Sequence, residues 1–177
     1  MTEFAPGQTA LVIHVPEAEP VVGSWRSRFD SSAAHGVPAH VTVLYPFLDA
    51  DRVDAGVVAA LGELFAAHAA FDARFSACGR FPGVIYLTPD PDAPFRELTE
   101  AVAARWPEAP PYGGQFEEVL PHLTVADGVP ADIQDMIEAE LSGRLPVTTR
   151  VRVVALETFD GALWKETAFF PLGCPEA

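Results

Sequence analysis

The chain is poor in basic residues and contains no long apolar stretch. Its 177 residues include 11 Lys and Arg against 25 Asp and Glu, a formal net charge of −14. Because neutralisation of phosphates supplies most of the affinity for long nucleic acids, this shortage argues against a protein that holds a long RNA or DNA. No apolar run approaches the roughly 20 residues that cross a bilayer, so we expect no membrane association.

Cysteine is also scarce, and no export signal is evident. Residues 1–6 lack the basic start and apolar stretch of a signal peptide. Two cysteines without such a signal, Cys78 and Cys174, are most simply reduced thiols, so we expect a cytoplasmic protein. With 49% hydrophobic residues the chain is expected to be ordered. Its length fits one domain, or two lobes that share a core, and we expect a monomer.

The apolar periodicity predicts a mixed α+β fold with about eight strands. Helices are predicted over 19–29, from Asp51 or Asp54 to about 69, over 94–106 and over 130–141. Short apolar runs predict strands, including a hairpin of 147–159 and 163–170 about the Asp160-Gly161 turn.

One short phrase occurs twice. Residues 39–45 read Ala-His-Val-Thr-Val-Leu-Tyr, and residues 121–125 read Pro-His-Leu-Thr-Val. In a strand, side chains two apart share a face, so His40 lies beside Thr42 and His122 beside Thr124. A shift of 82 residues superimposes the two motifs. The spacing indicates a duplicated unit with one His-x-Thr motif in each half.

These residue types suit acid–base chemistry on a phosphate ester. Opening a cyclic phosphodiester needs a base that takes a proton from water and an acid that protonates the departing oxygen, and histidine does either near neutrality. His40 and His122 are therefore the catalytic candidates, and the sequence leaves open which is the base. Thr42 and Thr124 are expected to donate hydrogen bonds to the phosphate oxygens. The structural alternative is two half-buried histidines bonded to their threonines.

The two motifs resemble those of the two-histidine (2H) phosphoesterase superfamily. The segment 40–47, His-Val-Thr-Val-Leu-Tyr-Pro-Phe, is similar to the bacterial branch described as 2′-5′ RNA ligase family proteins. The resemblance covers nearly the whole chain. It implies a single domain, 1–177, of two pseudo-symmetric lobes, in which two mainly antiparallel sheets face a central cleft with helices outside. It also implies action on phosphodiesters of RNA ends and small nucleotides, often 2′,3′-cyclic phosphates, without a metal or other cofactor.

Three further residues are secondary candidates for substrate contact. Tyr45 lies on the strand face opposite His40 if the pairing is regular, and reaches the cleft only if the chain turns at Pro46. Arg80 and Lys165 offer positive charge. Each has an ordinary alternative, a packed aromatic for Tyr45 and a solvated charge for the other two.

The remaining histidines, His14, His35 and His68, are read as structural because none belongs to such a pair. Neither motif is followed by a carboxylate at ligand spacing, and two histidines on separate strands make a poor zinc site, so no metal site is predicted.

Three functions stay open at this stage. The first is a metal-independent phosphodiesterase that hydrolyses a cyclic or 2′-linked phosphodiester in a small nucleotide. The second is an enzyme of RNA 3′ ends, either a 2′,3′-cyclic phosphate hydrolase or a reversible 2′-5′ ligase, which the acidic composition does not favour. The third is a nucleotide-binding module without catalysis.

Overall fold

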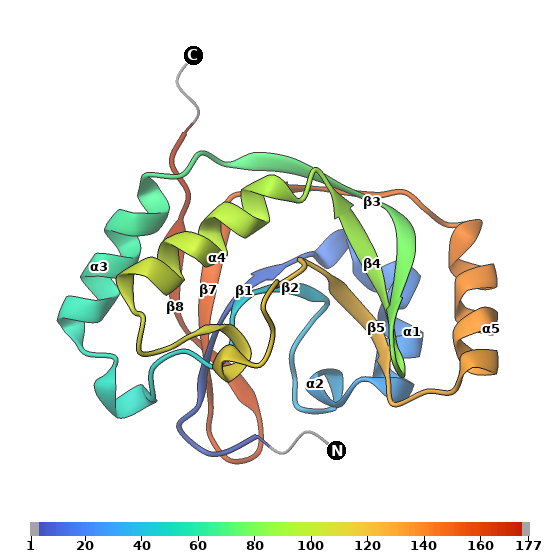
Figure 1. Ribbon diagram of the computed structural model, residues 1–177, viewed down its shortest axis with the longest axis horizontal. Coiled ribbons are helices and arrows are strands. Elements are labelled where there is room, and N and C mark those ends of the chain that lie inside the picture. Colours follow the sequence, from blue (N-terminus) through green and yellow to red (C-terminus); the bar gives the residue numbers. More distant parts are fainter. Residues whose placement is uncertain (1–3, 175–177) are drawn as a thin grey trace.

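The computed structural model describes residues 4–174, which form two four-stranded antiparallel sheets with helices packed on them (Figure 1). The first sheet has the order β2-β1-β7-β8 and the second the order β5-β4-β3-β6. The strands are β1 (Thr9–His14), β2 (His40–Leu44), β3 (Phe71–Phe81), β4 (Val84–Asp90), β5 (Leu123–Asp127), β6 (Val147–Val151), β7 (Val153–Phe159) and β8 (Trp164–Pro171). The helices are α1 (Glu19–Phe29), α2 (Ser31–Ala34), α3 (Ala55–Ala66), α4 (Ala93–Arg105) and α5 (Ala131–Ser142). The predicted α+β fold of two mainly antiparallel sheets is confirmed.

The predicted strand 147–159 is wrong in one respect, because it is two strands in two different sheets. β6 pairs with β3, whereas β7 pairs with β1 and β8. Burial alternates along β6, but residues 154–157 of β7 are all buried. A strand inside a sheet that is covered on both faces loses the alternation. No Gly or Pro separates the two strands in the sequence, so 147–159 reads as one strand. The hairpin of β7 and β8 forms as predicted.

Each motif strand is an edge strand of its sheet, and the two motif strands contact each other. The helices strengthen this junction, because α1, which precedes β2, packs against β5, while α4 packs against β2. Thr99 of α4 donates a hydrogen bond from Oγ1 to the carbonyl oxygen of Val43 at 2.7 Å. The position of each motif strand therefore depends on the helix from the other half of the chain.

The two motif strands carry the same irregularity. β2 pairs with β1 through Thr42↔Val12 and Leu44↔Leu11, so that Val43 has no partner. β5 pairs with β4 through Thr124↔Tyr86 and Ala126↔Ile85, which leaves Val125 without a partner. Each is a β-bulge, and each follows its threonine directly. The likeness of the two halves extends to this backbone detail.

One apolar core joins the two sheets. It includes side chains of both sheets and of the helices, among them Leu11, Phe65, Phe75 and Phe95, which are almost completely buried. On α3, Leu61 and Phe65 lie four residues apart and form its buried face. None of the helices between residues 4 and 174 combines the length and apolar character that crossing a membrane requires.

Candidate active site

The two motif histidines have the same local geometry. Nδ1 of His40 lies 2.8 Å from the carbonyl oxygen of Pro38, and Nδ1 of His122 lies 2.8 Å from that of Leu120. A carbonyl only accepts, so Nδ1–H donates in both cases. In a neutral imidazole this leaves Nε2 with a free lone pair. Both rings are thus fixed with the nitrogen that can take a proton turned away from the backbone.

The surroundings lower the pKa of both histidines below the ordinary value of 6.5. For His40 the main cause is burial, and the nearby Arg26 cation adds to it, while the Pro38 carbonyl and the carboxylates of Asp30 and Glu157 oppose it. For His122 burial is the cause, and the Leu120 carbonyl opposes it. Burial acts this way because it penalises the charged imidazolium. Burial therefore favours the neutral form of both histidines when no ligand is bound.

Two aromatic rings pack against one side of His122. Its ring centroid lies 5.4 Å from that of Phe81 and 5.3 Å from that of Tyr86, and the Phe81 and Tyr86 centroids are 4.4 Å apart. Gly79 makes room for this cluster, because a Cβ there would lie 2.5 Å from the Tyr86 ring. The cluster excludes water from one side of His122, consistent with its lowered pKa. Sequence reasoning missed both rings because they come from other strands.

On the first sheet, Tyr45 lies on the same side as His40 and Thr42. The three residues line a pocket of about 110 Å³ together with Trp164 and Glu157. The expectation that Tyr45 faces away rested on regular pairing, and the bulge at Val43 reverses the alternation of side chains beyond it. The Tyr45 hydroxyl donates to Oε1 of Gln8 at 3.0 Å.

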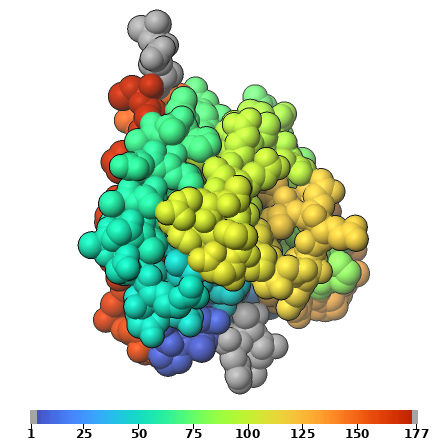
Figure 2. Space-filling view, turned by 60° about the vertical axis from the view of Figure 1, so that its left-hand side comes forward, coloured from blue at the N-terminus to red at the C-terminus, as the bar shows by residue number. Residues whose placement is uncertain are grey.

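The segment between α4 and β5 returns to the first motif. The backbone N–H of Tyr112 donates to the Tyr45 carbonyl at 2.6 Å, and burial raises the pKa of the Tyr112 phenol, with the nearby Thr42 hydroxyl opposing the shift. Tyr112 has a φ of 50°, which is uncommon for a residue other than glycine. Figure 2 shows this segment in yellow on the surface, against the cyan segment that follows β2. It links the first motif to the loop that leads into His122.

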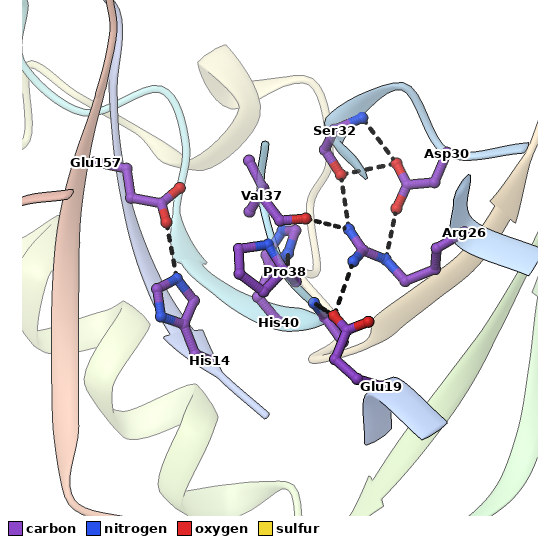
Figure 3. Close-up of polar contacts among 10 residues, drawn as sticks. His14, Glu19, Arg26, Asp30, Ser32, Val37, Pro38, His40 and Glu157 are labelled. Atoms are coloured by element: carbon purple, nitrogen blue, oxygen red, sulfur yellow. Dashed lines mark hydrogen bonds and ion pairs between the residues drawn. The ribbon is translucent and has the colours of Figure 1, made fainter. Parts of the chain in front are cut away.

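A buried ionic network holds the residues before β2 (Figure 3). Arg26 of α1, 2% exposed, donates from Nε to Asp30 at 3.1 Å and from its terminal nitrogen Nη2 to the Val37 carbonyl at 3.0 Å. Glu19 accepts from the backbone N–H of Ala39 at 2.5 Å. Arg26 and Glu19 thus hold the backbone on both sides of Pro38, whose carbonyl accepts from His40 and orients its ring. We therefore regard Arg26 as a positioning residue for His40.

The structure does not bring the two secondary cations to the motifs. Arg80 is bonded to Asp135 at 2.9 Å and to Glu138, both on α5, and Lys165 is bonded to Asp160 at 2.8 Å. Phe81, which follows Arg80 and lies on the other face of the strand, packs against His122. Trp164, which precedes Lys165 and lies on the other face of its strand, lines the pocket. Alternation thus turns both cations away from the motif faces.

His14 does belong to the site face, contrary to its reading as an ordinary strand residue. It is the cross-strand partner of His40, with Nε2 2.7 Å from Glu157 Oε1 and Nδ1 3.4 Å from Glu166 Oε1. These contacts, above all the bond to Glu157, raise the pKa of His14. The three groups lie within 4.8 Å of one another, as metal ligands do. However, both ring nitrogens already face a carboxylate, which an imidazolium satisfies without a metal.

A larger hollow lies away from both motifs. It has a volume of about 580 Å³ and is lined by groups of both signs, including Arg74 and Arg150 with Asp72 and Asp90. Arg150 is paired with Asp72 at 3.2 Å. The smaller pocket beside His40 is therefore the better candidate for the reaction site, because it alone of these two contains a motif.

Two His-x-Thr strands on two antiparallel sheets are the arrangement expected of a 2H phosphoesterase, and the comparison with known families agrees. The family model of the 2′-5′ RNA ligase superfamily matches residues 14–162, so this chain belongs to that superfamily. The resemblance to 2H phosphoesterases is thereby confirmed. A search of curated proteins found no match.

Solved structures with the same fold include two bacterial proteins. Escherichia coli LigT complexed with 3′-AMP is 16% identical with a TM-score of 0.61, over 95% of this chain and 99% of LigT. LigT has also been solved with NADP⁺, with a TM-score of 0.60 at 17% identity over 96% of this chain and 99% of LigT. TT0787 of Thermus thermophilus is 20% identical with a TM-score of 0.62, over 96% of this chain and all of TT0787 (100%). At this identity the likeness concerns the fold.

Proposed function

We propose that this protein is a metal-independent phosphodiesterase that hydrolyses a cyclic or 2′-linked phosphodiester in a small nucleotide. The observation that carries the proposal is the matched geometry of His40 and His122, in which a backbone carbonyl binds Nδ1–H and leaves Nε2 available. Membership of the superfamily supports phosphoester chemistry. The acidic composition favours a small substrate over a long RNA.

In this mechanism one histidine accepts a proton from the attacking water through Nε2, and the other donates a proton to the departing ribose oxygen. Burial favours the neutral form of both in the free protein, so the acid gains its proton when the substrate binds. The negative charge of the phosphate raises the pKa of an adjacent imidazole and favours that step. The hydroxyls of Thr42 and Thr124 donate to the non-bridging oxygens and stabilise the developing charge.

The proposal treats the whole chain as one functional unit of two lobes, each of which contributes one motif. The contact between β2 and β5 supports it, because the motif strands are neighbours although they belong to different sheets. The relatives support a nucleotide as the substrate, since LigT has been solved with 3′-AMP, with ATP and with NADP⁺.

The test is hydrolysis of 2′,3′-cyclic nucleotides in the presence of EDTA. We expect turnover in the wild type, and a loss of roughly 10²- to 10⁴-fold in His40→Ala and in His122→Ala, the usual contribution of one acid or base. His68→Ala is the matched control, because His68 follows α3 and bonds the Leu64 carbonyl. Loss of activity with EDTA, or motif variants as active as the control, would contradict the proposal.

A further inference from the structure

Three aromatic side chains line the pocket beside His40. Phe4, Tyr45 and Trp164 meet edge to face, with ring centroids 5.3 Å apart for Phe4 and Trp164 and 6.0 Å apart for Tyr45 and Trp164. Its volume is about 110 Å³. A closed protein cavity of about 150 Å³ accommodates benzene, so this smaller but partly open pocket admits only the edge of a planar ring, with the rest of the ligand outside.

A buried carboxylate also lines this pocket. Glu157 is 3% exposed, and its Oε1 is bonded to His14 Nε2 at 2.7 Å (Figure 3). Its Oε2 has no hydrogen-bond partner within residues 4–174. A buried carboxylate beside a phosphate site is unfavourable unless its charge is compensated. The His14 ring, whose pKa is raised chiefly by its bond to Glu157, supplies that compensation and leaves Glu157 able to accept hydrogen bonds from a ligand.

A second polar group in the same wall also lacks a partner. Trp164 is 8% exposed, and its Nε1–H is a buried donor without an acceptor in the described part of the chain. This nitrogen has almost no accessible surface, so it does not present a donor to the pocket. The pocket thus combines aromatic side chains with one acceptor, Glu157, that has capacity left over.

We propose that Glu157 makes this pocket a guanine site, so that the substrate is a guanine nucleotide; this inference rests on the proposed function. A carboxylate pairs best with two adjacent donors, and guanine presents N1–H beside its 2-amino group; Oε2 is open to one of them, and Oε1 keeps a second lone pair for the other beside its bond to His14. Adenine and cytosine place a ring acceptor next to their amino group, and uracil flanks its single N–H with two carbonyls. Each of these edges sets an acceptor against the carboxylate.

The experiment compares kcat/KM for the 2′,3′-cyclic phosphates of guanosine, inosine, adenosine, cytidine and uridine. One well-made pair of hydrogen bonds to a base discriminates by about 10- to 100-fold, and we expect guanosine to be preferred by this margin. Inosine lacks the 2-amino group and should fall between guanosine and the others. Glu157→Gln should remove most of the preference. Glu166→Gln is the matched control, because it removes a carboxylate that contacts His14 but does not line the pocket.

Equal turnover of the five nucleotides, or a guanosine preference that survives in Glu157→Gln, would overturn the inference and leave the proposed function intact. Absence of turnover for all five would count against the proposed function instead. Calorimetric binding of guanosine 3′-monophosphate and adenosine 3′-monophosphate then decides the inference. Tighter binding of the guanosine compound that depends on Glu157 supports it, and equal binding of the two overturns it.

Discussion

Replacement of Arg26 by methionine is expected to destabilise the protein strongly. The guanidinium is buried in the network that precedes β2, where it pairs with Asp30 at 3.1 Å and donates to the Val37 carbonyl at 3.0 Å and to Ser32 Oγ at 3.2 Å. Asp30 is itself only 8% exposed. Methionine fills much of the same volume but leaves this carboxylate without its cation.

The expected cost follows from the unpaired charge. Removal of one partner of a buried ion pair typically costs about 3–5 kcal/mol, because the other charge stays buried without compensation. Ser32 continues to donate to Asp30 through its backbone N–H and its hydroxyl, which limits the loss. We therefore expect about 3 kcal/mol. This is a large part of the roughly 5–15 kcal/mol by which domains are stable, and it lowers Tm by roughly 10 °C.

Urea unfolding of three variants tests this reasoning. Arg28→Met is the matched control, because Arg28 is exposed on the same helix and only stacks on the rings of Trp25 and Phe29, a contact worth about 0.5–1 kcal/mol. The double variant Arg26→Met/Asp30→Leu removes both charges, and should be more stable than Arg26→Met alone. If Arg26→Met costs no more than Arg28→Met, the network is not the support that we describe.

Three further predictions concern pH and packing. Because the pKa of both motif histidines is lowered below 6.5, the singly protonated pair is most populated below that value, and kcat/KM should peak on the acid side of pH 6.5; a peak above it would be inconsistent with the burial argument. The pKa of His14 is raised in the folded protein. The stabilisation that its ion pair gives is therefore complete below the pKa of His14 in the unfolded chain, and it is lost as pH rises through the pKa in the folded protein. His14→Gln should thus cost more unfolding free energy at about pH 5.5 than at about pH 9. The reverse order would refute the ion pair. Gly79→Ala sets a Cβ 2.5 Å from the Tyr86 ring, so it should cost about 1–3 kcal/mol in urea unfolding and should lower turnover. Gly143→Ala is the control, because Gly143 has open space around it. Equal stability of the two variants would show that the Tyr86 ring moves freely.

Some features of the site are local and could be predicted from the sequence. The shared face of His40 and Thr42, and of His122 and Thr124, follows from strand periodicity alone. The helices follow from apolar spacing, and α3 begins after Asp54, whose side chain accepts from the Val57 N–H at 2.9 Å. These features depend on neighbours within a few residues, which the sequence displays directly.

Other features depend on which strands pair. The orientation of Tyr45 changes because Val43 bulges out of the ladder with β1, and nothing within 39–45 specifies that bulge. The split of 147–159 into β6 and β7 likewise depends on two different partner strands. Arg80 and Lys165 were plausible substrate contacts until the structure placed an acidic partner within reach of each.

By itself, the sequence determined the class of the protein, the two histidine–threonine pairs and the mixed α+β character, because these are written in short-range patterns and in an internal repeat. Only the tertiary structure decided the surroundings of those pairs. His14, Glu157 and Trp164 come from β1, β7 and β8, and they meet on one face because the chain returns to its first sheet after about 140 residues, a consequence of sheet order rather than of local sequence. The charge around each histidine, and the shape of the pocket beside it, are therefore properties of the assembled sheets.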